Sequence, residues 1–159
     1  MVERSYYFDT DANATNIRAE YLKHIAKIFE LTGENTEKSR SNAALILKLE
    51  TDLAKNSRKL EDMRDPIKNY NKMTLAQLNA LTSNINWNTM FTNLKIKDAD
   101  TIIVGQPEFY KGLNASLKNY SVEDWKIYLK WDLFNSYAGN LNTAIEKQNF
   151  YFYATVMNG

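Results

Sequence analysis

The stretch YLKHIAKIFELTG, residues 21–33, predicts a helical fold. Apolar side chains recur every three or four positions across residues 13–32, which is the spacing of an amphipathic helix. They place one set of side chains on a common face: Ile17, Tyr21, Ile25, Ile28 and Phe29, with Leu22 and Leu31 beside it. Gly33 then ends the helix, because glycine adopts the left-handed conformation common at helix C-termini.

A second helix follows after the turn GENTEKSR, residues 33–40, and runs to about Asn56. Its predicted inner face consists of Ala43, Ile46, Leu47, Leu53 and Ala54, with either Leu49 or Glu50. Because the turn is short, we expect these two helices to form an antiparallel hairpin.

Local signals place the remaining elements. Thr74 and Gln77 form a capping box before a short helix over 75–81, and Asn86 caps another helix. TIIVG, residues 101–105, is the one convincing strand, being β-branched and continuous.

The C-terminal half is again predicted to be helical. Pro107 occupies a first-turn position, and Ser121 with Asp124 opens a further helix. That helix should bury a largely aromatic set: Trp125, Tyr128, Leu129, Tyr137 and either Leu133 or Trp131. A break near Gly139 precedes a last helix over about 141–157. The predicted fold class is all-α, with antiparallel helix hairpins and at most one or two very short strands.

The amino-acid composition excludes several classes of function. The 159 residues are 44% hydrophobic and 25% charged, as in a single globular domain, and a net charge of +1 offers no field to attract nucleic acid. There is no cysteine, which excludes thiol nucleophiles and disulfides. No apolar run reaches the about 18 residues of a membrane span, and MVERSYYFDT does not resemble a signal peptide. We therefore expect a cytoplasmic protein or an excised fragment.

Catalytic constellations are missing from the sequence. A catalytic zinc site needs about three protein ligands, whereas His24 is the only histidine. Because His24 lies among lysines between Tyr21 and Ile28, we expect it to face solvent. Adjacent carboxylates such as Glu123 and Asp124 do not share a helix face. We predict no catalytic residue and no metal ligand in this chain.

Aromatic residues crowd the C-terminal half: Tyr110, Tyr120, Trp125, Tyr128, Trp131, Phe150, Tyr151, Phe152 and Tyr153. They indicate either a core or a platform that binds peptide or carbohydrate. The run 150–153 covers every side of a helix, so it should be buried by a partner or by more chain. A glycine at 159 is typical of a helix C-cap with chain beyond it. A fragment is therefore expected, whose exposed aromatic end self-associates.

Taken in order, eight blocks resemble the N-terminal region of the neprilysin family of zinc metalloendopeptidases, whose bacterial members are called PepO. They are RSYY (4–7), YLKHIAKIFELTG (21–33), LETDLA (49–54), RDPIKNYNKMT (64–74), Asn86-Trp87, IVGQPEFY (103–110), WKIYLKW (125–131) and NFYFYATVMNG (149–159). Ser5 departs from the pattern, because the family prefers aspartate there.

The resemblance implies that residues 1–159 are a single helical unit, a fragment of the lid domain of a two-domain peptidase. That lid encloses a chamber and admits peptides, while the zinc and the catalytic glutamate belong to a catalytic domain absent from this fragment. The missing domain would pack against this region, and the parent would be exported in a bacterium or work in the cytoplasm. The alternative is a self-contained helical module that binds peptide or carbohydrate through its C-terminal aromatics.

The motif residues are expected to be structural: Arg64, Asp65, Tyr70, Asn71, Trp87, Trp125, Tyr128 and Trp131. In the corner 64–74, Asp65-Pro66 stops one element and Thr74 starts the next. We expect Arg64 and Asp65 to pair with backbone or with each other, and Tyr70 to pack inward.

Overall fold

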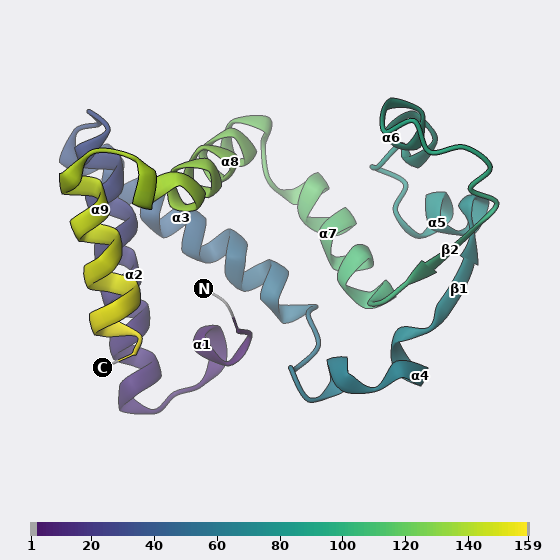
Figure 1. Cartoon of the computed structure of the whole chain (residues 1–159), viewed down its shortest axis with the longest axis horizontal. Helices are drawn as coiled ribbons and strands as arrows, with labels where there is room; N and C mark the ends of the chain where they lie inside the picture. Colours follow the sequence, from purple (N-terminus) through teal and green to yellow (C-terminus); the bar gives the residue numbers. More distant parts are fainter. Residues whose placement is uncertain (1–2, 159) are drawn as a thin grey trace. The chain divides into compact units, whose positions relative to one another are not determined.

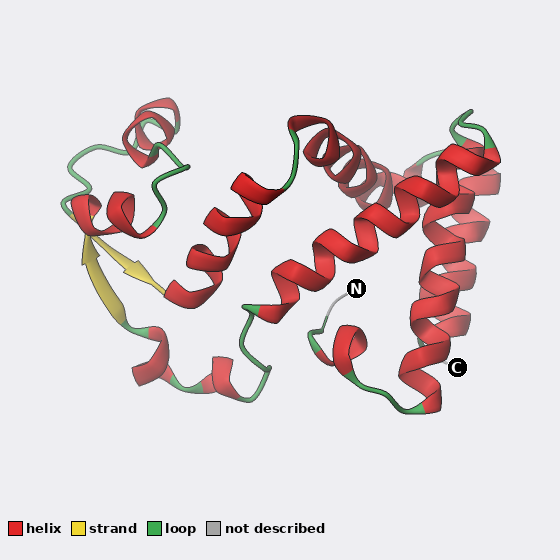
Figure 2. Ribbon diagram, turned by 180° about the vertical axis from the view of Figure 1, so that it is seen from behind, coloured by secondary structure: helices red, strands yellow, loops and turns green. Residues whose placement is uncertain are grey.

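The computed structural model describes residues 3–158, in which helices dominate (Figures 1 and 2). The α-helices are α1 (Ser5–Phe8), α2 (Ala12–Leu31), α3 (Thr36–Lys55), α4 (Pro66–Asn69), α5 (Leu75–Leu81), α6 (Trp87–Asn93), α7 (Pro107–Asn119), α8 (Val122–Tyr137) and α9 (Thr143–Phe150). Short helical turns are η1 (Asp62–Arg64), η2 (Ala138–Asn140) and the π-helical η3 (Tyr151–Val156). Strands β1 (Asn71–Thr74) and β2 (Thr101–Val104) form one antiparallel pair. The predicted mostly helical class is confirmed.

The chain divides into two compact units. Unit 1 combines the segment up to Thr51 with the segment from Ser121 onward, and unit 2 is the continuous segment Asp52–Tyr120. The prediction that residues 1–159 are one helical piece of a larger lid domain stays a prediction, because compactness in space does not define a domain's full extent.

Helix α2 is the centre of unit 1. Its N-cap Asp11 accepts a hydrogen bond from the Ala14 amide at 3.0 Å. The predicted apolar face is buried in a core with Ala43 and Ile46 of α3, Trp131 of α8 and Phe152 of η3. Figures 1 and 2 show α3 diverging from α2, whereas α9 runs antiparallel along it. The predicted antiparallel hairpin of α2 and α3 was therefore wrong, and the antiparallel partner of α2 is α9. The apolar face of α2 is wide enough to be covered by α3, α8 and the C-terminal helix together.

His24 corrects another prediction. It is 1% exposed rather than solvent-facing, and its ring stacks on Phe152 with centroids 4.8 Å apart. Its position three residues after Tyr21 and four before Ile28 puts it on the core face of α2, and this spacing could have revealed the burial. The neighbouring lysines misled the prediction.

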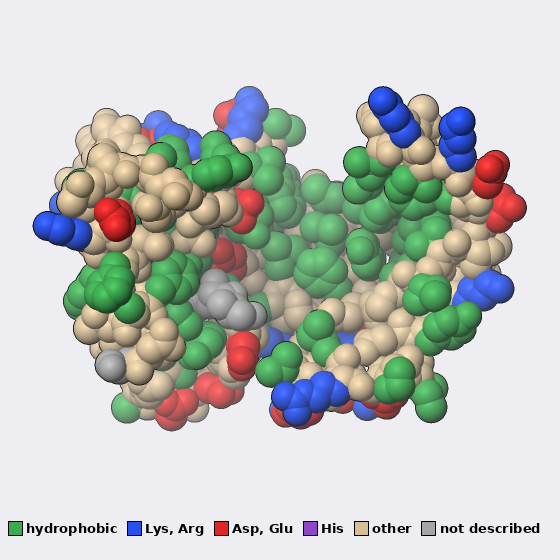
Figure 3. All heavy atoms as spheres, viewed as in Figure 1, with side chains coloured by type: hydrophobic (Ala, Val, Ile, Leu, Met, Phe, Trp, Pro, Cys, Tyr) green, Lys and Arg blue, Asp and Glu red, His purple; other side chains and the backbone are tan. Residues whose placement is uncertain are grey.

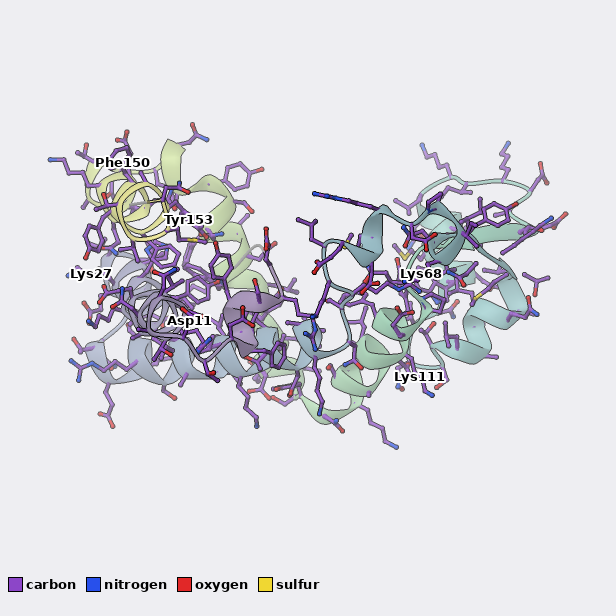
Figure 4. All side chains as sticks on the ribbon, turned by 90° about the horizontal axis from the view of Figure 1, so that it is seen from below. Asp11, Lys27, Lys68, Lys111, Phe150 and Tyr153 are labelled. Carbon is purple, nitrogen blue, oxygen red and sulfur yellow. The ribbon has the colours of Figure 1, made fainter. Side chains whose placement is uncertain are left out.

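Helix α8 buries less than predicted. Trp131 is buried, and Trp125 and Tyr128 are half-buried, but Leu129, Leu133 and Tyr137 are exposed. The C-terminal aromatic run is also split: Phe152 is buried and Tyr153 packs on the core, while Phe150 and Tyr151 are exposed. In Figure 4, Phe150 lies on the outer side of the C-terminal helix and Tyr153 on the side nearer the other helices. Burial of Phe150 and Tyr151 by a partner or by more chain stays a prediction, because both are exposed in this chain.

Unit 2 has its own smaller core around Leu78, Trp87 and Val104. The predicted strand is β2, but its partner β1 lies in a segment predicted only as a loop. Met73 of β1 faces Ile102 of β2 in the register. A four-residue strand carries too little periodicity to be recognised alone.

The predicted start signals are confirmed. Thr74 and Gln77 form the capping box of α5, and Ser121 with Asp124 forms that of α8. Asn86 caps α6 by accepting from the Thr89 amide at 2.9 Å. Pro107 is the first residue of α7.

A Gly112→Ala substitution is expected to destabilise unit 2. Gly112 is buried in α7, and an added Cβ would lie 2.6 Å from the Cβ of Asn56, which is too close for two carbon atoms. Alanine gains about 1 kcal/mol of helix propensity, whereas overpacking costs about 1–3 kcal/mol. We expect a net loss of about 1 kcal/mol in the free energy of unfolding, measured by urea denaturation.

The double variant Gly112→Ala/Asn56→Gly removes the clash and should recover stability relative to Asn56→Gly alone. Gly139→Ala is the matched control, since nothing lies within 4 Å of its added Cβ. If Gly112→Ala stabilised the protein, the close approach of α7 to Asn56 would be refuted.

Candidate functional site

The motif residues of unit 1 meet at a shared carboxylate. Glu50 on α3 accepts hydrogen bonds from the hydroxyl groups of Tyr7 at 2.8 Å and Tyr21 at 2.9 Å. Tyr7 comes from α1 and Tyr21 from α2, so one side chain joins three helices. Burial, and then the negative charge of Glu50, raise the pKa of both hydroxyl groups well above the ordinary tyrosine value. Both tyrosines therefore stay neutral donors at physiological pH.

The aromatic motif WKIYLKW on α8 takes part in ring contacts within unit 1. Trp131 is buried against Tyr21, with ring centroids 6.0 Å apart in an edge-to-face arrangement. Trp125 and Tyr128 contact each other in the same geometry at 5.8 Å. Burial, and then Glu50, raise the pKa of Tyr128 to about 12. Of these side chains, Trp131 packs in the core of unit 1, and Trp125 and Tyr128 are half-buried.

In unit 2, the corner 64–74 is fixed by Asp65. Its carboxylate caps α4 by accepting from the amides of Ile67 at 2.9 Å and Lys68 at 3.2 Å. Asp65 thus pairs with backbone, as expected. The side chain of Arg64 is exposed and has no hydrogen-bond partner within residues 3–158. Tyr70 is 60% exposed, so its predicted inward packing was wrong.

Arg58, which the sequence did not single out, ties this corner to α7. Its guanidinium pairs with Glu108 and donates to the Lys68 carbonyl at 2.8 Å and to Asn69 Oδ1 at 2.9 Å. Its backbone amide donates to Gln106 Oε1 at 2.9 Å. The hydrogen bond from Arg58 holds the pKa of Glu108 below its ordinary value. Because Gln106 and Glu108 are about 50 positions away in the sequence, the residues next to Arg58 show no pattern that predicts these contacts.

Two further motif residues act close to the corner. Asn71 donates to the Lys68 carbonyl at 2.8 Å, which holds the start of β1 against α4. Trp87 is buried, and its indole Nε1 donates to Thr82 Oγ1 at 2.6 Å, which satisfies the polar end of a core side chain. Both contacts stabilise unit 2.

A hydrogen bond joins the two ends of unit 2. The Tyr120 hydroxyl donates to Asp52 Oδ2 at 2.6 Å, although the two residues are 68 positions apart. Asp52 lies in the last turn of α3 and Tyr120 directly follows α7. The chain therefore enters and leaves unit 2 at neighbouring points.

An Asp65→Ala substitution should lower the free energy of unfolding of unit 2 by about 1 kcal/mol, the usual effect of losing an N-cap. The amides of Ile67 and Lys68 would lose their acceptor. Thermal unfolding measures the effect, and Arg64→Ala is the adjacent control, expected to change stability by less than about 0.5 kcal/mol. Equal stability of the two variants would contradict a capping role for Asp65.

Potential metal ligands are dispersed in the described part of the chain. Across residues 3–158, no three side chains of His, Cys, Asp or Glu come together in a geometry that could hold a metal ion. The described helices include none that is long and apolar enough to cross a membrane. Figure 3 shows acidic and basic side chains interspersed over the visible surface, with no broad field of one sign.

Comparison with known proteins gives one consistent result. The N-terminal model of peptidase family M13 matches residues 1–159. An endothelin-converting enzyme homolog from Locusta migratoria is 32% identical over 139 residues, which cover 80% of this chain and 19% of the relative. Neprilysin-3 from Drosophila melanogaster is 30% identical over 137 residues, which cover 79% of this chain and 17% of the relative.

A solved structure agrees with these relatives. The zinc metalloprotease Zmp1 of Mycobacterium tuberculosis in its open state matches all of this chain and 25% of its own, with a TM-score of 0.91 and 29% identity. The chain therefore spans about a fifth to a quarter of the length of the proteins it matches.

Proposed function

Because the chain belongs to peptidase family M13, a family of zinc metalloendopeptidases, we propose that it is part of the helical lid enclosing the substrate chamber of such an enzyme. The main support for this proposal is the match of all 159 residues to the family's N-terminal model. The hydrogen bonds from Tyr21 to Glu50 and from Tyr120 to Asp52, which join distant parts of the chain, agree with it. In this proposal the fragment is inactive alone.

The residues present do not fit a zinc site. The single histidine, His24, is enclosed by the rings of Tyr21, Trp131, Phe152 and Tyr153. Its Nδ1 lies 3.3 Å from the Gln148 amide nitrogen, and no second histidine or cysteine can join it. The zinc that activates water in the family's peptidases would therefore be bound by another part of the parent protein.

As a lid, the chain would contribute a stiff wall. The Glu50 carboxylate fixes α1, α2 and α3, and Arg58 fixes the corner of unit 2. Walls of this kind restrict entry to flexible peptides and keep the bound peptide away from bulk water, which strengthens electrostatic interactions in the chamber. Peptide substrates, and packing of the catalytic domain against this region, are part of the same proposal.

The compartment of the parent is also a proposal. One relative is named membrane metallo-endopeptidase-like 1, from Homo sapiens, and is 28% identical over 157 residues. On that support we propose that the parent acts outside the cytoplasm. Phe150 and Tyr151, exposed on the C-terminal helix, keep self-association of the isolated chain as an expectation.

The test is to read the complete gene and to assay two proteins. We expect the reading frame to encode H-E-x-x-H beyond these residues, and the longer protein to bind zinc and cleave peptides. The 159-residue chain should bind no zinc and cleave nothing. Stoichiometric zinc on the 159-residue chain, or a longer reading frame without a zinc motif, would refute the proposal.

A further inference from the structure

Helix α8 exposes an apolar stripe on the side opposite Trp131. The stripe consists of Val122, Leu129, Leu133 and Tyr137, which are 70%, 60%, 55% and 56% exposed. Their spacings of seven, four and four residues place them along one line of the helix surface. Both sides of α8 are thus apolar, although only one is covered. Figure 3 shows green side chains at the surface in the area that α8 occupies in Figure 1.

Both lysines along the stripe are paired within unit 1, whereas the exposed Asp132 on its other edge has no ion pair within residues 3–158. Lys126 bonds Glu123 at 2.7 Å, and Lys130 bonds Glu34 at 2.6 Å. Each lysine lies against a carboxylate of unit 1, which weakens its attraction for an acidic partner. The surface therefore fits an uncharged, apolar segment. Such a segment would pack as a helix alongside α8, with apolar side chains at the same spacings as those of the stripe.

The size of the stripe indicates how its partner is connected. Its exposed area is of the order of 500 Å², below the roughly 800 Å² per partner that a stable interface between separate proteins buries. A segment of the same polypeptide needs less area, because the connecting chain keeps its effective concentration in the millimolar range. The relatives contain about four fifths of their length outside the matched region, so such a segment is available.

We propose that the α8 stripe is the docking surface of an apolar segment from the part of a family-length polypeptide that lies outside these 159 residues. This inference rests on the proposed function, because it requires the longer polypeptide. The segment packs along α8 and shields Leu129 and Leu133 from solvent.

Thiol labelling tests the proposal, because the chain has no cysteine of its own. Leu129→Cys and Leu133→Cys are introduced into the 159-residue chain and into the family-length protein, whose other accessible thiols are removed. Ile67→Cys is the control, since Ile67 is 85% exposed and lies in unit 2. The labelling rate at 129 and 133 should fall more than about tenfold in the longer protein, as expected for a shielded site, and the rate at 67 should not.

Each other outcome overturns the inference. Equally fast labelling of Leu129→Cys in both proteins shows an uncovered stripe, and if the longer protein still binds zinc and cleaves peptides, the proposed function survives. Slow labelling in a dimeric 159-residue chain assigns the stripe to a second copy, and slow labelling in the monomer shows that the 159-residue chain itself covers the stripe. Equal protection of position 67 shows general occlusion. A gene without a zinc peptidase beyond these residues overturns both proposals.

Discussion

A Phe152→Ala substitution is expected to lower the free energy of unfolding of unit 1 by about 3–5 kcal/mol, the range for deleting a fully buried phenylalanine ring. Phe152 is 0% exposed, and its ring centroid lies 5.3 Å from that of Tyr21 and 4.8 Å from that of His24. The side chain joins η3 to α2, so its loss leaves a cavity between two rigid helices that cannot close it.

Phe150→Ala is the matched control, because the same ring two residues earlier is 67% exposed. Its expected effect is within about 0.5 kcal/mol. Chemical denaturation followed by circular dichroism compares the two variants. Similar losses for both would contradict the orientation of the C-terminal helix, because a rotated helix would bury Phe150 instead.

Acidification is expected to destabilise unit 1 through His24. Burial lowers the pKa of His24 from 6.5 to about 4, so the folded state resists protonation while the unfolded state accepts a proton below pH 6.5. The contribution of neutral His24 is complete above pH 6.5, falls as the pH drops towards 4, and levels off below that. A shift of this size corresponds to about 3 kcal/mol.

The measurement is the free energy of unfolding between pH 7.5 and about 3.5 for the wild type and for His24→Phe, which keeps an aromatic ring against Phe152 but cannot titrate. Carboxylates affect both proteins alike, so the difference between the two curves isolates the imidazole. We expect the wild type to lose stability relative to His24→Phe between pH 6.5 and 4. Parallel curves over that interval would contradict the burial of His24.

Local chemistry made much of this fold predictable. Thr74, Asn86, Pro107 and Ser121 each start a helix where the sequence predicted, because a cap or a first-turn proline acts within three or four residues of its own position. The helical class follows from the same short-range periodicity. For Asp65 the sequence predicted pairing with backbone or with Arg64, and the structure adds that its carboxylate caps α4 through the amides of Ile67 and Lys68.

Contacts between distant segments were not predictable in this way. Arg58 is held by Glu108, and Glu50 is held by Tyr7 and Tyr21. No local sequence pattern predicts such pairs. The inward packing predicted for Tyr70 failed because a single aromatic residue in a loop has no periodicity to orient it. Leu129 was predicted to be buried because it is apolar, and of the alternatives Leu133 and Trp131 only Trp131 is buried, because periodicity cannot reveal which partner covers a face.

The hydrogen bond between Tyr120 and Asp52 bears on the order of folding. Unit 1 is discontinuous, so it cannot be completed until the segment after Ser121 has left the ribosome, whereas unit 2 is continuous and can fold during synthesis. Bringing together the ends of a flexible segment as long as 52–120 costs roughly 4 kcal/mol of chain entropy. Once unit 2 has folded and its ends are joined, that entropy has already been lost, and the two halves of unit 1 meet as near neighbours.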